Sequence, residues 1–306
     1  QPAPTLFDHA NWRFCAMRAL GARDFSSLTA DYYDRDDPLL VEFIARHTLP
    51  RRGITARPEE ILITMGAQNA LWLTAGVLLD QGRTAVIEDP CYHALRDILR
   101  QTGCAMQPAA VDGDGLPPAA LTRADVIFRT PSHQSPTTAT MPMDRRQALL
   151  ARARDLDALI VEDDYEFELS FLGAPYPALK SMDRDGRVIY VGSFSKSLFP
   201  GLRLGYLVGS EPFIREARCA PRCCDTLRAT CSARPPISCR SGITTPRSAA
   251  CRVPCMPAVR CWKPRLPITA SPSPVAGPMA ARRSGCGRLT GWTPAGWRRA
   301  CVLTAC

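Results

Sequence analysis

The chain has 306 residues and a formal net charge of +9. This length can bury the core of one large or two ordinary domains. No run approaches the roughly 18 to 20 apolar residues that a membrane-spanning helix needs, and Gln1 begins neither a signal peptide nor a natural translation start. We therefore expect a soluble, cytoplasmic protein without a membrane partner, whose natural N-terminus lies upstream of Gln1.

Charge and cysteine content divide the chain near Arg218. The part after Arg218 has 14 basic residues and one acidic residue, a charge of +13, whereas the part up to Arg218 has 24 basic and 28 acidic residues, a charge of −4. Eleven of the 14 cysteines also follow Arg218, and this tail has no Glu, Phe, Tyr or His. The tail lacks the apolar periodicity and the aromatic core of a folded domain.

Three interpretations of residues 219–306 compete. A disulfide or zinc module would explain the cysteines, but they fall irregularly and lack paired CxxC spacing. A disordered nucleic-acid-binding arm would explain the charge, but Cys and Trp interrupt it. We favour translation of GC-rich coding sequence in the wrong frame, which gives Arg, Pro, Ala, Ser and Cys without pattern. Function would then be carried by residues 1–218.

Residues 58–218 alternate short β-rich runs with helical patterns of period 3.6, such as the apolar face of Ala70, Leu71, Val77 and Leu78. Several runs are unbroken and apolar, as strands covered on both faces should be. This alternation predicts an α/β domain with a mostly parallel sheet, whose ligands bind at the carboxyl ends of the strands. The candidate strands are Ile61–Thr64, Thr84–Glu88, Val126–Arg129, Leu159–Glu162, Val188–Gly192 and Gly205–Val208.

Residues 1–57 form a less regular segment that leads into this domain, with a helix expected over Leu39–His47. Asp144 is the predicted N-cap of a helix that follows it. The run Asp112-Gly113-Asp114-Gly115 predicts a turn and not a calcium loop, because leucine and proline occupy the next ligand positions. We expect no metal site.

Lys196 follows an apolar strand in the run Ser193-Phe194-Ser195-Lys196. A lysine partly buried at a strand end can lose its proton and attack an aldehyde. Arg203 offers a planar fork suited to a phosphate, and Ser193 adds a hydroxyl donor. The pattern predicts a lysine that binds a phosphorylated aldehyde, with a surface lysine in a polar loop as the alternative.

Three carboxylates and a phenol, Glu162, Asp163, Asp164 and Tyr165, follow the apolar run that begins at Leu159. Buried carboxylates are costly unless they meet a cation, and a protonated pyridine nitrogen is such a cation. A carboxylate there keeps the ring an electron sink. A metal site and a solvated acidic turn are the alternatives.

Two other strand ends give weaker signals. Gly66, Ala67 and Gln68 join a strand to a helix, where backbone N–H groups and the helix dipole favour an anion. Tyr92 offers a ring that could stack on a pyridine, although a core or rim tyrosine is commoner.

Together with the runs Thr130 to Thr137 and Ser195 to Pro200, these elements resemble the fold-type I pyridoxal 5'-phosphate (PLP)-dependent aminotransferases of class I/II. They are most similar to the aminotransferase-like domain of MocR-type regulators of the GntR superfamily. The resemblance covers about residues 30–218 and implies a PLP-dependent transferase-like large domain, with a small C-terminal domain that is missing or scrambled.

The resemblance implies that Lys196 is the catalytic residue and forms the Schiff base with PLP. It implies that Asp163 pairs with the pyridine nitrogen and that Tyr165 bonds the phenolic oxygen. We choose Asp163 over Asp164 because alternate strand residues face the same side, which places Asp163 with Tyr165. The other implied cofactor contacts are Gly66, Ala67, Gln68, Ser193 and Arg203 at the phosphate, Ser195 beside the lysine, Tyr92 on the ring, and His133 or Gln134 where many relatives have asparagine.

The chain departs from this family at three places. Thr138 stands where a glycine commonly occurs, and the tract from Tyr32 to Pro38 lacks a glycine usual near the substrate entrance. The small C-terminal domain, with the arginine that grips a substrate carboxylate, has no counterpart after Arg218. Cofactor residues are thus expected in this chain, and substrate residues are not.

Three functions remain open. The first is the effector domain of a transcriptional regulator that binds PLP, senses an amine, an amino acid or PLP itself, and contacts DNA only through a winged-helix domain upstream of Gln1. For the intact parent we expect a homodimer whose small-molecule ligand is an amine, amino acid or oxo acid. The second is a free-standing transaminase, in which Lys196 also shuttles the proton. The third is a non-functional truncated product, so enzyme activity of this chain itself is uncertain.

Overall fold

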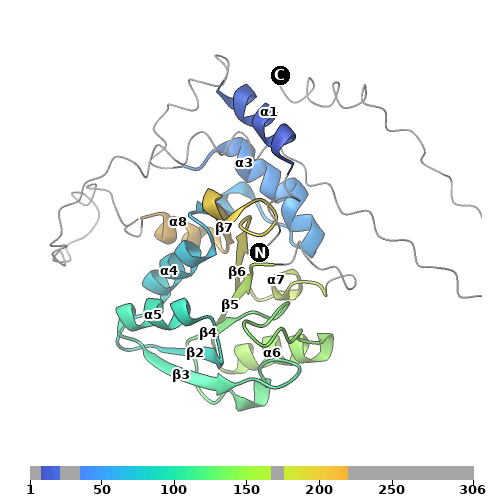
Figure 1. The fold of residues 1–306 in the computed structure, drawn as a ribbon. Helices are drawn as coiled ribbons and strands as arrows, with labels where there is room; N and C mark the ends of the chain where they lie inside the picture. Colours follow the sequence, from blue (N-terminus) through green and yellow to red (C-terminus); the bar gives the residue numbers. More distant parts are fainter. Residues whose placement is uncertain (1–7, 21–34, 167–175, 220–306) are drawn as a thin grey trace, which may run out of the picture. The chain divides into compact units, whose positions relative to one another are not determined.

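The computed structural model describes residues 8–20, 35–166 and 176–219 (Figure 1). Residues 32–34 of the tract noted above and the tail from residue 220 lie outside the described residues. The out-of-frame origin of residues 219–306 therefore stays a prediction.

A seven-stranded sheet forms the centre of the described chain, in the order β1-β7-β6-β5-β4-β2-β3. β7 runs antiparallel to β1 and β6, and all other neighbouring pairs are parallel. This confirms the predicted, mostly parallel sheet. The strands are β1 (Ile61–Thr64), β2 (Thr84–Asp89), β3 (Ala105–Ala110), β4 (Val126–Arg129), β5 (Leu159–Asp164), β6 (Val188–Ser193) and β7 (Gly205–Val208).

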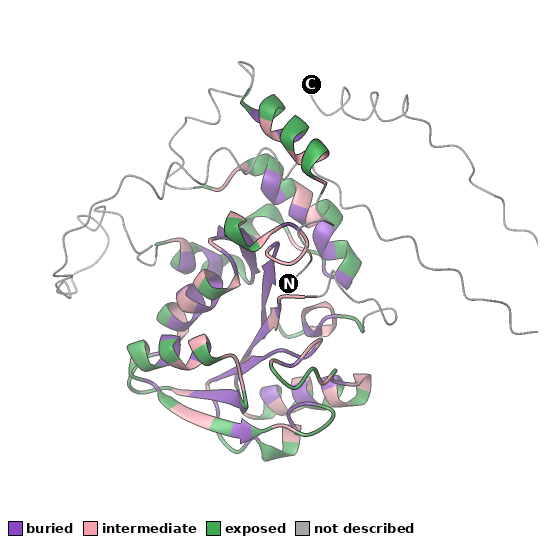
Figure 2. Ribbon diagram, viewed as in Figure 1, coloured by how far each residue is buried: buried purple, intermediate pink, exposed green. Residues whose placement is uncertain are grey.

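The central strands are covered on both faces, as their apolar runs require. Every residue of β1, β4, β6 and β7 is buried (Figure 2). On β6, Ile189 and Val191 face one side and join one apolar core, whereas Val188 and Tyr190 face the other side and join two further cores. The sheet is therefore the middle layer of three.

Helices supply the two outer layers (Figure 1). One face packs against α4 (Ala67–Leu78), α5 (His93–Thr102) and α8 (Glu211–Cys219). The opposite face packs against α6 (Met143–Asp155) and α7 (Leu179–Met182) over one part of the sheet. Over the other part lie α3 (Pro38–Phe43), the π-helical η2 (Ile44–Thr48) and the 3-10 helix η3 (Leu49–Arg52), with Trp12 of α1 (His9–Ala19) packed against this core.

The sequence did not reveal β3. This strand lies at the edge of the sheet, pairs with β2 alone and contains Pro108. An edge strand tolerates proline because one side of its backbone needs no partner in the ladder. Ala109 is its one buried residue, so the strand carries no apolar run that a pattern search would find.

Asp144 was predicted wrongly as an N-cap. Helix α6 begins at Met143 after Pro142, whose extended backbone precedes the first turn, so Asp144 lies inside that turn. Its charge can still favour the helix through the dipole. Side-chain capping occurs at Asp37, which accepts hydrogen bonds from the backbone N–H groups of Leu39 and Leu40, and at Asp8, which accepts one from Asn11 N.

Two other local predictions are confirmed. The helix expected over residues 39–47 is present as α3 and η2, and it continues through η3 to Gly53, which has a φ of 71°. The expected turn at Asp112 is closed by two backbone hydrogen bonds between Asp112 and Gly115.

Candidate functional site

The predicted site residues lie where the carboxyl ends of the parallel strands meet, which is called the site edge of the sheet below. Strand direction brings them there. β1, β2, β4, β5 and β6 all end there, and the antiparallel β7 begins there. Gly205, the first residue of β7, is in register with both Thr64 and Ser193, the last residues of β1 and β6. Segments far apart in the sequence thus leave the sheet side by side.

Gly66 and Arg203 form the first part of the site. Gly66 precedes α4 with a φ of 82°, a conformation that favours glycine, and a Cβ on it would lie 2.9 Å from Nη2 of Arg203. Arg203 Nη2 donates to the backbone oxygen of Met65 at 3.4 Å. The guanidinium therefore lies over the turn at the N-terminus of α4, where positive charge, backbone N–H groups and the helix dipole together suit an anion.

Two other contacts fix this turn. Asn69 Oδ1 accepts a hydrogen bond from Met65 N at 3.0 Å. A Cβ on Gly205 would lie 2.8 Å from the backbone carbon of Gly66, so β7 and the turn approach each other backbone to backbone. Ala67 and Gln68 begin α4 beyond this point, and the Gln68 residue is exposed.

Lys196 lies in the segment between β6 and β7. Phe194 and Leu198, on either side of it, are buried in the core, and Phe194 N donates to the Leu204 oxygen at 3.0 Å. Ser193 Oγ accepts from the backbone N–H of Ser195 at 3.1 Å. The lysine itself is thus held on an anchored turn while its side chain stays partly exposed.

The Lys196 side chain reaches toward the end of β5. Its Nζ lies 3.8 Å from Oε1 of Glu166 and 6.0 Å from the centre of the Tyr165 ring. Glu166 Oε2 also lies 3.5 Å from Nε2 of His133, and the His133 and Tyr165 rings meet edge to face at 6.2 Å. The structure therefore brings together Lys196, Tyr165 and His133, with Glu166 between them.

The two aspartates that end β5 have different partners. Asp164 Oδ2 accepts hydrogen bonds from Arg52 Nε at 2.6 Å and from the Tyr190 hydroxyl at 2.8 Å. Asp163 lies on the other side of the strand, and its Oδ1 is buried without a hydrogen-bond partner among the described residues. Burial, and then the charges of Asp164 and Glu88, raise the pKa of Asp163 to about 7.

The third carboxylate of this run is structural. Glu162 is fully buried, and its two oxygens accept the backbone N–H groups of Leu179 and Lys180, which begin α7. Burial, and then the Asp164 charge, raise the pKa of Glu162 to about 7. Of the three acidic side chains, Asp163 alone has its carboxylate turned to the side of Tyr165.

Tyr165 is half-buried beside these carboxylates. Burial raises the pKa of its phenol to about 12, and the charges of Glu166 and Asp163 act in the same direction. A hydrogen bond with the Ser135 side chain partly opposes this rise in the pKa. The phenol therefore keeps its proton at neutral pH and can donate a hydrogen bond to an oxygen anion.

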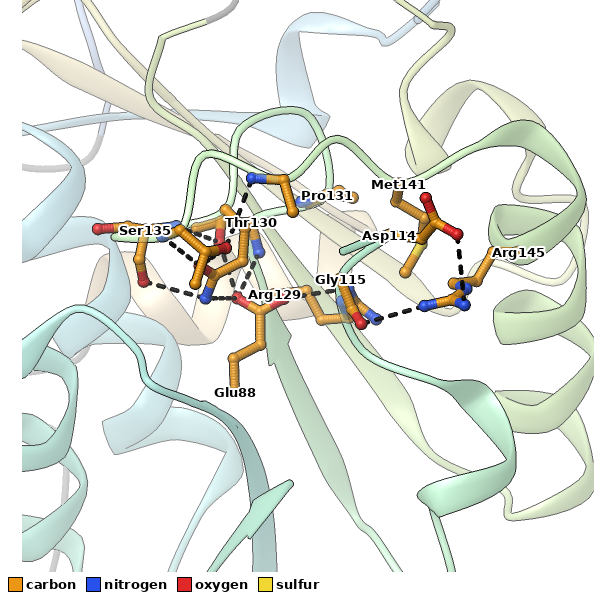
Figure 3. Close-up of polar contacts among 12 residues, drawn as sticks. Glu88, Asp114, Gly115, Arg129, Thr130, Pro131, Ser135, Met141 and Arg145 are labelled. Carbon is orange, nitrogen blue, oxygen red and sulfur yellow. Dashed lines mark hydrogen bonds and ion pairs between the residues drawn. The ribbon is translucent and has the colours of Figure 1, made fainter. Parts of the chain in front are cut away.

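The loop after β4 is organised around Glu88, as Figure 3 shows. Arg129 Nη2 and the Thr130 hydroxyl donate to the Glu88 carboxylate at 3.0 and 2.7 Å. Gln134 Nε2 donates to the oxygens of Pro90 and Ser135, and Gln134 Oε1 accepts from Thr137. These bonds hold the Gln134 amide inside the loop, whereas His133 reaches Tyr165.

Tyr92 precedes α5 at the end of β2 and packs partly against the core. Its ring centre lies 5.2 Å from that of His93. Tyr92 therefore lies at the predicted edge of the sheet, but the contact recorded for its ring is with its neighbour and not with Lys196 or Asp163.

Sequence reasoning missed three side chains that shape this edge. Glu166 follows the acidic run and Tyr165, and its sequence context does not distinguish it from an acidic residue in a solvated turn. Asn69 accepts a hydrogen bond from Met65 within the local turn. Arg52 donates to Asp164, which is 112 residues away in the sequence. Spacing along the chain gave no signal for Arg52.

Comparison with known proteins agrees with this arrangement. The family description "Aminotransferase class I and II" matches residues 15–233. The chain belongs to that family. The match includes every strand and every predicted site residue.

Among the family's regulators, the chain is 57% identical over 237 residues to the HTH-type transcriptional regulator TauR of Rhodobacter capsulatus, covering 77% of this chain and 48% of that protein. It is 40% identical over 173 residues to the probable rhizopine catabolism regulatory protein MocR of Rhizobium meliloti, covering 56% of this chain and 35% of that protein. The chain thus spans about half, or less, of the curated relatives it matches.

Among solved structures, LysN, the α-aminoadipate aminotransferase of Thermus thermophilus, is 31% identical with a TM-score of 0.65, over 72% of this chain and 57% of that one. It was solved with N-(5'-phosphopyridoxyl)-L-leucine.

The described residues fit a phosphorylated pyridine aldehyde. The buried, unpartnered Oδ1 of Asp163 suits a pyridine N–H, and the cradle that a Gly66 Cβ would fill lies under Arg203, as a phosphate requires. No group of three His, Cys, Asp or Glu residues in the described ranges is placed to hold a metal ion. No helix within these ranges is long and apolar enough to cross a membrane.

Proposed function

We propose that this chain is the PLP-binding, ligand-sensing part of a MocR-type transcriptional regulator. The observation that carries the proposal is the edge of the sheet where Lys196, Tyr165 and the unpartnered Asp163 carboxylate meet. The regulators TauR and MocR among its relatives support sensing as the role of this edge.

In this proposal the side chains have the following roles. Lys196 holds the cofactor covalently, and Asp163 pairs with the ring nitrogen. Tyr165 donates to the ring oxygen, and His133 rather than Gln134 lies beside it. Tyr92 covers the ring. The phosphate is held by Arg203, Ser193 and the backbone N–H groups of the turn at Gly66, Ala67 and Gln68, with Ser195 supporting Ser193.

When bound, PLP supplies an electron sink for chemistry at an amine-bearing carbon. The chain's own side chains would bind and orient the cofactor and its ligand and transfer protons between them. Glu166 Oε1 lies 3.8 Å from Lys196 Nζ and would pair with the lysine ammonium whenever the lysine is not bonded to the cofactor. In this proposal the ligand that the regulator senses is a small amine, amino acid or oxo acid. The intact parent protein is a homodimer, and it contacts DNA through a region outside this chain.

Reconstitution of the chain with PLP tests the cofactor assignment. We expect the visible absorbance of lysine-bound PLP, and borohydride reduction should fix the cofactor to the peptide that contains Lys196. Lys196→Ala should abolish both signals. Lys180→Ala is the matched control, because Lys180 is also partly buried and pairs with Asp183 at 3.2 Å. Equal absorbance in the Lys196→Ala variant would disprove the assignment.

A second measurement separates sensing from a transaminase role, which the aminotransferases among the solved relatives favour. Amines and amino acids are added to the PLP-loaded chain with and without a 2-oxo acid. A sensor should show spectral exchange with the amine without steady formation of a new amino acid. Sustained turnover would instead support the transaminase, and no PLP binding at all would indicate a non-functional product.

A further inference from the structure

Arg52 joins four separate segments of the chain beneath the proposed site. It ends η3, and its side chain is 1% exposed. Nε donates to Asp164 Oδ2 at 2.6 Å, Nη1 to the Tyr176 oxygen at 2.7 Å, and Nη2 to Ser132 Oγ at 2.8 Å. Its contacts thus reach the end of β5, the loop after β4 and the segment before α7.

Only arginine can make this set of bonds. Its planar fork presents several N–H donors in fixed directions, whereas a lysine ammonium acts as a compact point charge. Burial by itself would lower the pKa of Arg52, but the Asp164 carboxylate and other nearby groups outweigh burial and raise the pKa. The guanidinium is therefore a permanent positive charge against Asp164.

This charge matters for the neighbouring aspartate. Asp163 and Asp164 are consecutive, and after burial the Asp164 charge is the next cause of the raised pKa of Asp163. Removal of Arg52 would take a positive charge from beside these two carboxylates. The pair would then bind an additional proton near neutral pH, because two buried carboxylates without a cation cannot both stay ionised.

We propose that Arg52 is a positioning residue, which neutralises Asp164 and so leaves Asp163 as the ionised carboxylate that receives the proton on the cofactor's ring nitrogen. The proposal rests on the proposed function, in which Asp163 faces that nitrogen. Other charged or titratable groups lie around the two aspartates: Glu162 and Tyr165 on and after β5, Glu88 on β2, Arg146 on α6, Tyr190 on β6 and Tyr206 on β7.

The test is a count of protons taken up when PLP binds the cofactor-free 306-residue chain. Calorimetric titrations at pH 8, in two buffers of different ionisation enthalpy, give this number for each variant. In the wild type Asp163 starts ionised, so its site gains a proton on binding. In Arg52→Met the Asp163 and Asp164 carboxylates already share an additional proton, which can pass to the ring nitrogen, so net uptake should fall by a sizeable fraction of one proton. Contributions from the phosphate and from Lys196 are shared and cancel in the difference.

Three variants distinguish positioning from a merely structural role. Arg52→Met combined with Asp164→Asn removes both charges and should restore the wild-type uptake. Arg52→Lys keeps the charge and should also retain it, even if binding weakens. Arg152→Met is the matched control, because Arg152 is partly buried and donates to the backbone oxygen of Leu121, with no carboxylate among its partners in the described residues. It should lower stability without changing the proton count.

Asp164→Asn alone keeps the proposal testable if Arg52→Met does not fold. With the Arg52 charge unopposed, Asp163 should be ionised at pH 6, so this variant should take up more protons than the wild type at that pH. Equal proton uptake in all folded variants would overturn the role of Arg52. Failure of the wild type to bind PLP, or binding that survives Lys196→Ala unchanged, would instead overturn the proposed function.

Discussion

The two sides of the β5 end solve the problem of a buried carboxylate in opposite ways. On one side, Asp164 Oδ2 is paired with Arg52 and Tyr190, although Asp164 Oδ1 is buried without a hydrogen bond. On the other side, Asp163 Oδ1 is also buried without a hydrogen bond, and no cation among the described residues pairs with Asp163. Burial of a charge is costly unless a partner compensates it. Asp164, whose charge a cation compensates, is part of the scaffold, whereas Asp163 has no such cation and is available to a ligand.

Breaking the paired side should have the largest effect. Arg52→Met leaves the buried Asp164 charge without its cation, and loss of one member of a buried pair costs about 3–5 kcal/mol. Urea unfolding of the cofactor-free chain at pH 7 measures this loss. Arg154→Met removes an exposed pair with Asp185 and should leave the midpoint unchanged within error. Equal effects of the two substitutions would mean that the buried Arg52–Asp164 pair contributes no more to the free energy of unfolding than an exposed pair does.

The unpaired side should respond in the opposite direction. The pKa of Asp163 is raised to about 7 in the folded chain, so its contribution favours folding below its unfolded pKa and is lost as pH rises through about 7. Asp163→Asn removes this loss and should stabilise the cofactor-free chain at pH 8 by about 2–4 kcal/mol, at about 1.4 kcal/mol per unit of pKa. The same substitution should weaken PLP binding.

Unfolding free energies at pH 5, 6, 7 and 8 test this sign. The curves of wild type and Asp163→Asn should diverge as pH rises, although both keep the slope that comes from Glu162, whose pKa is also about 7. Asp80→Asn, at an exposed turn, is the control and should run parallel to the wild type. An Asp163→Asn curve parallel to that of the wild type would show that the pKa of Asp163 is not raised in the folded chain.

Tyr190→Phe sharpens the comparison on the paired side. It removes the hydroxyl that donates to Asp164 Oδ2 at 2.8 Å, and a hydrogen bond to a charged group contributes about 1.5–3 kcal/mol. A double-mutant cycle with Asp164→Asn isolates this term from the packing of the ring. The cost of Tyr190→Phe should shrink in the Asp164→Asn background. An unchanged cost would assign it to packing alone.

Most of the sheet could be predicted because burial on both faces leaves a continuous apolar run. β1, β4 and β7 have the predicted bounds, and β2, β5 and β6 extend one or two residues farther. β3 was not predicted because an edge strand needs no continuous apolar run. The preference for Asp163 over Asp164 also came from strand alternation, and the role of Asp163 at the ring nitrogen stays a prediction.

The supporting contacts of the site could not be predicted in this way. Arg52 meets Asp164 across 112 residues, and Glu88 meets Gln134 across 46. Such contacts depend on which segments the folded chain brings together, and no local spacing encodes them. Motifs thus predict which side chains face a ligand, whereas the partners that hydrogen-bond to those side chains or form ion pairs with them become visible only in the folded structure.

Gly66→Ala extends the comparison from side chains to the backbone and should have the smallest effect on stability. Gly66 has a φ of 82° and a ψ of 173°, a region essentially restricted to glycine, in which a residue with a Cβ costs about 1–3 kcal/mol. Gly186 also has a positive φ, of 70°, but no atom lies near the position of its Cβ. Gly186→Ala is therefore the control for a positive-φ glycine that makes no contact with Arg203. Both variants should lower stability in urea unfolding, but only Gly66→Ala should displace Arg203, whose Nη2 lies 2.9 Å from the new Cβ, and so lower PLP affinity. Equal PLP affinity in both variants would remove Arg203 and this turn from the phosphate site.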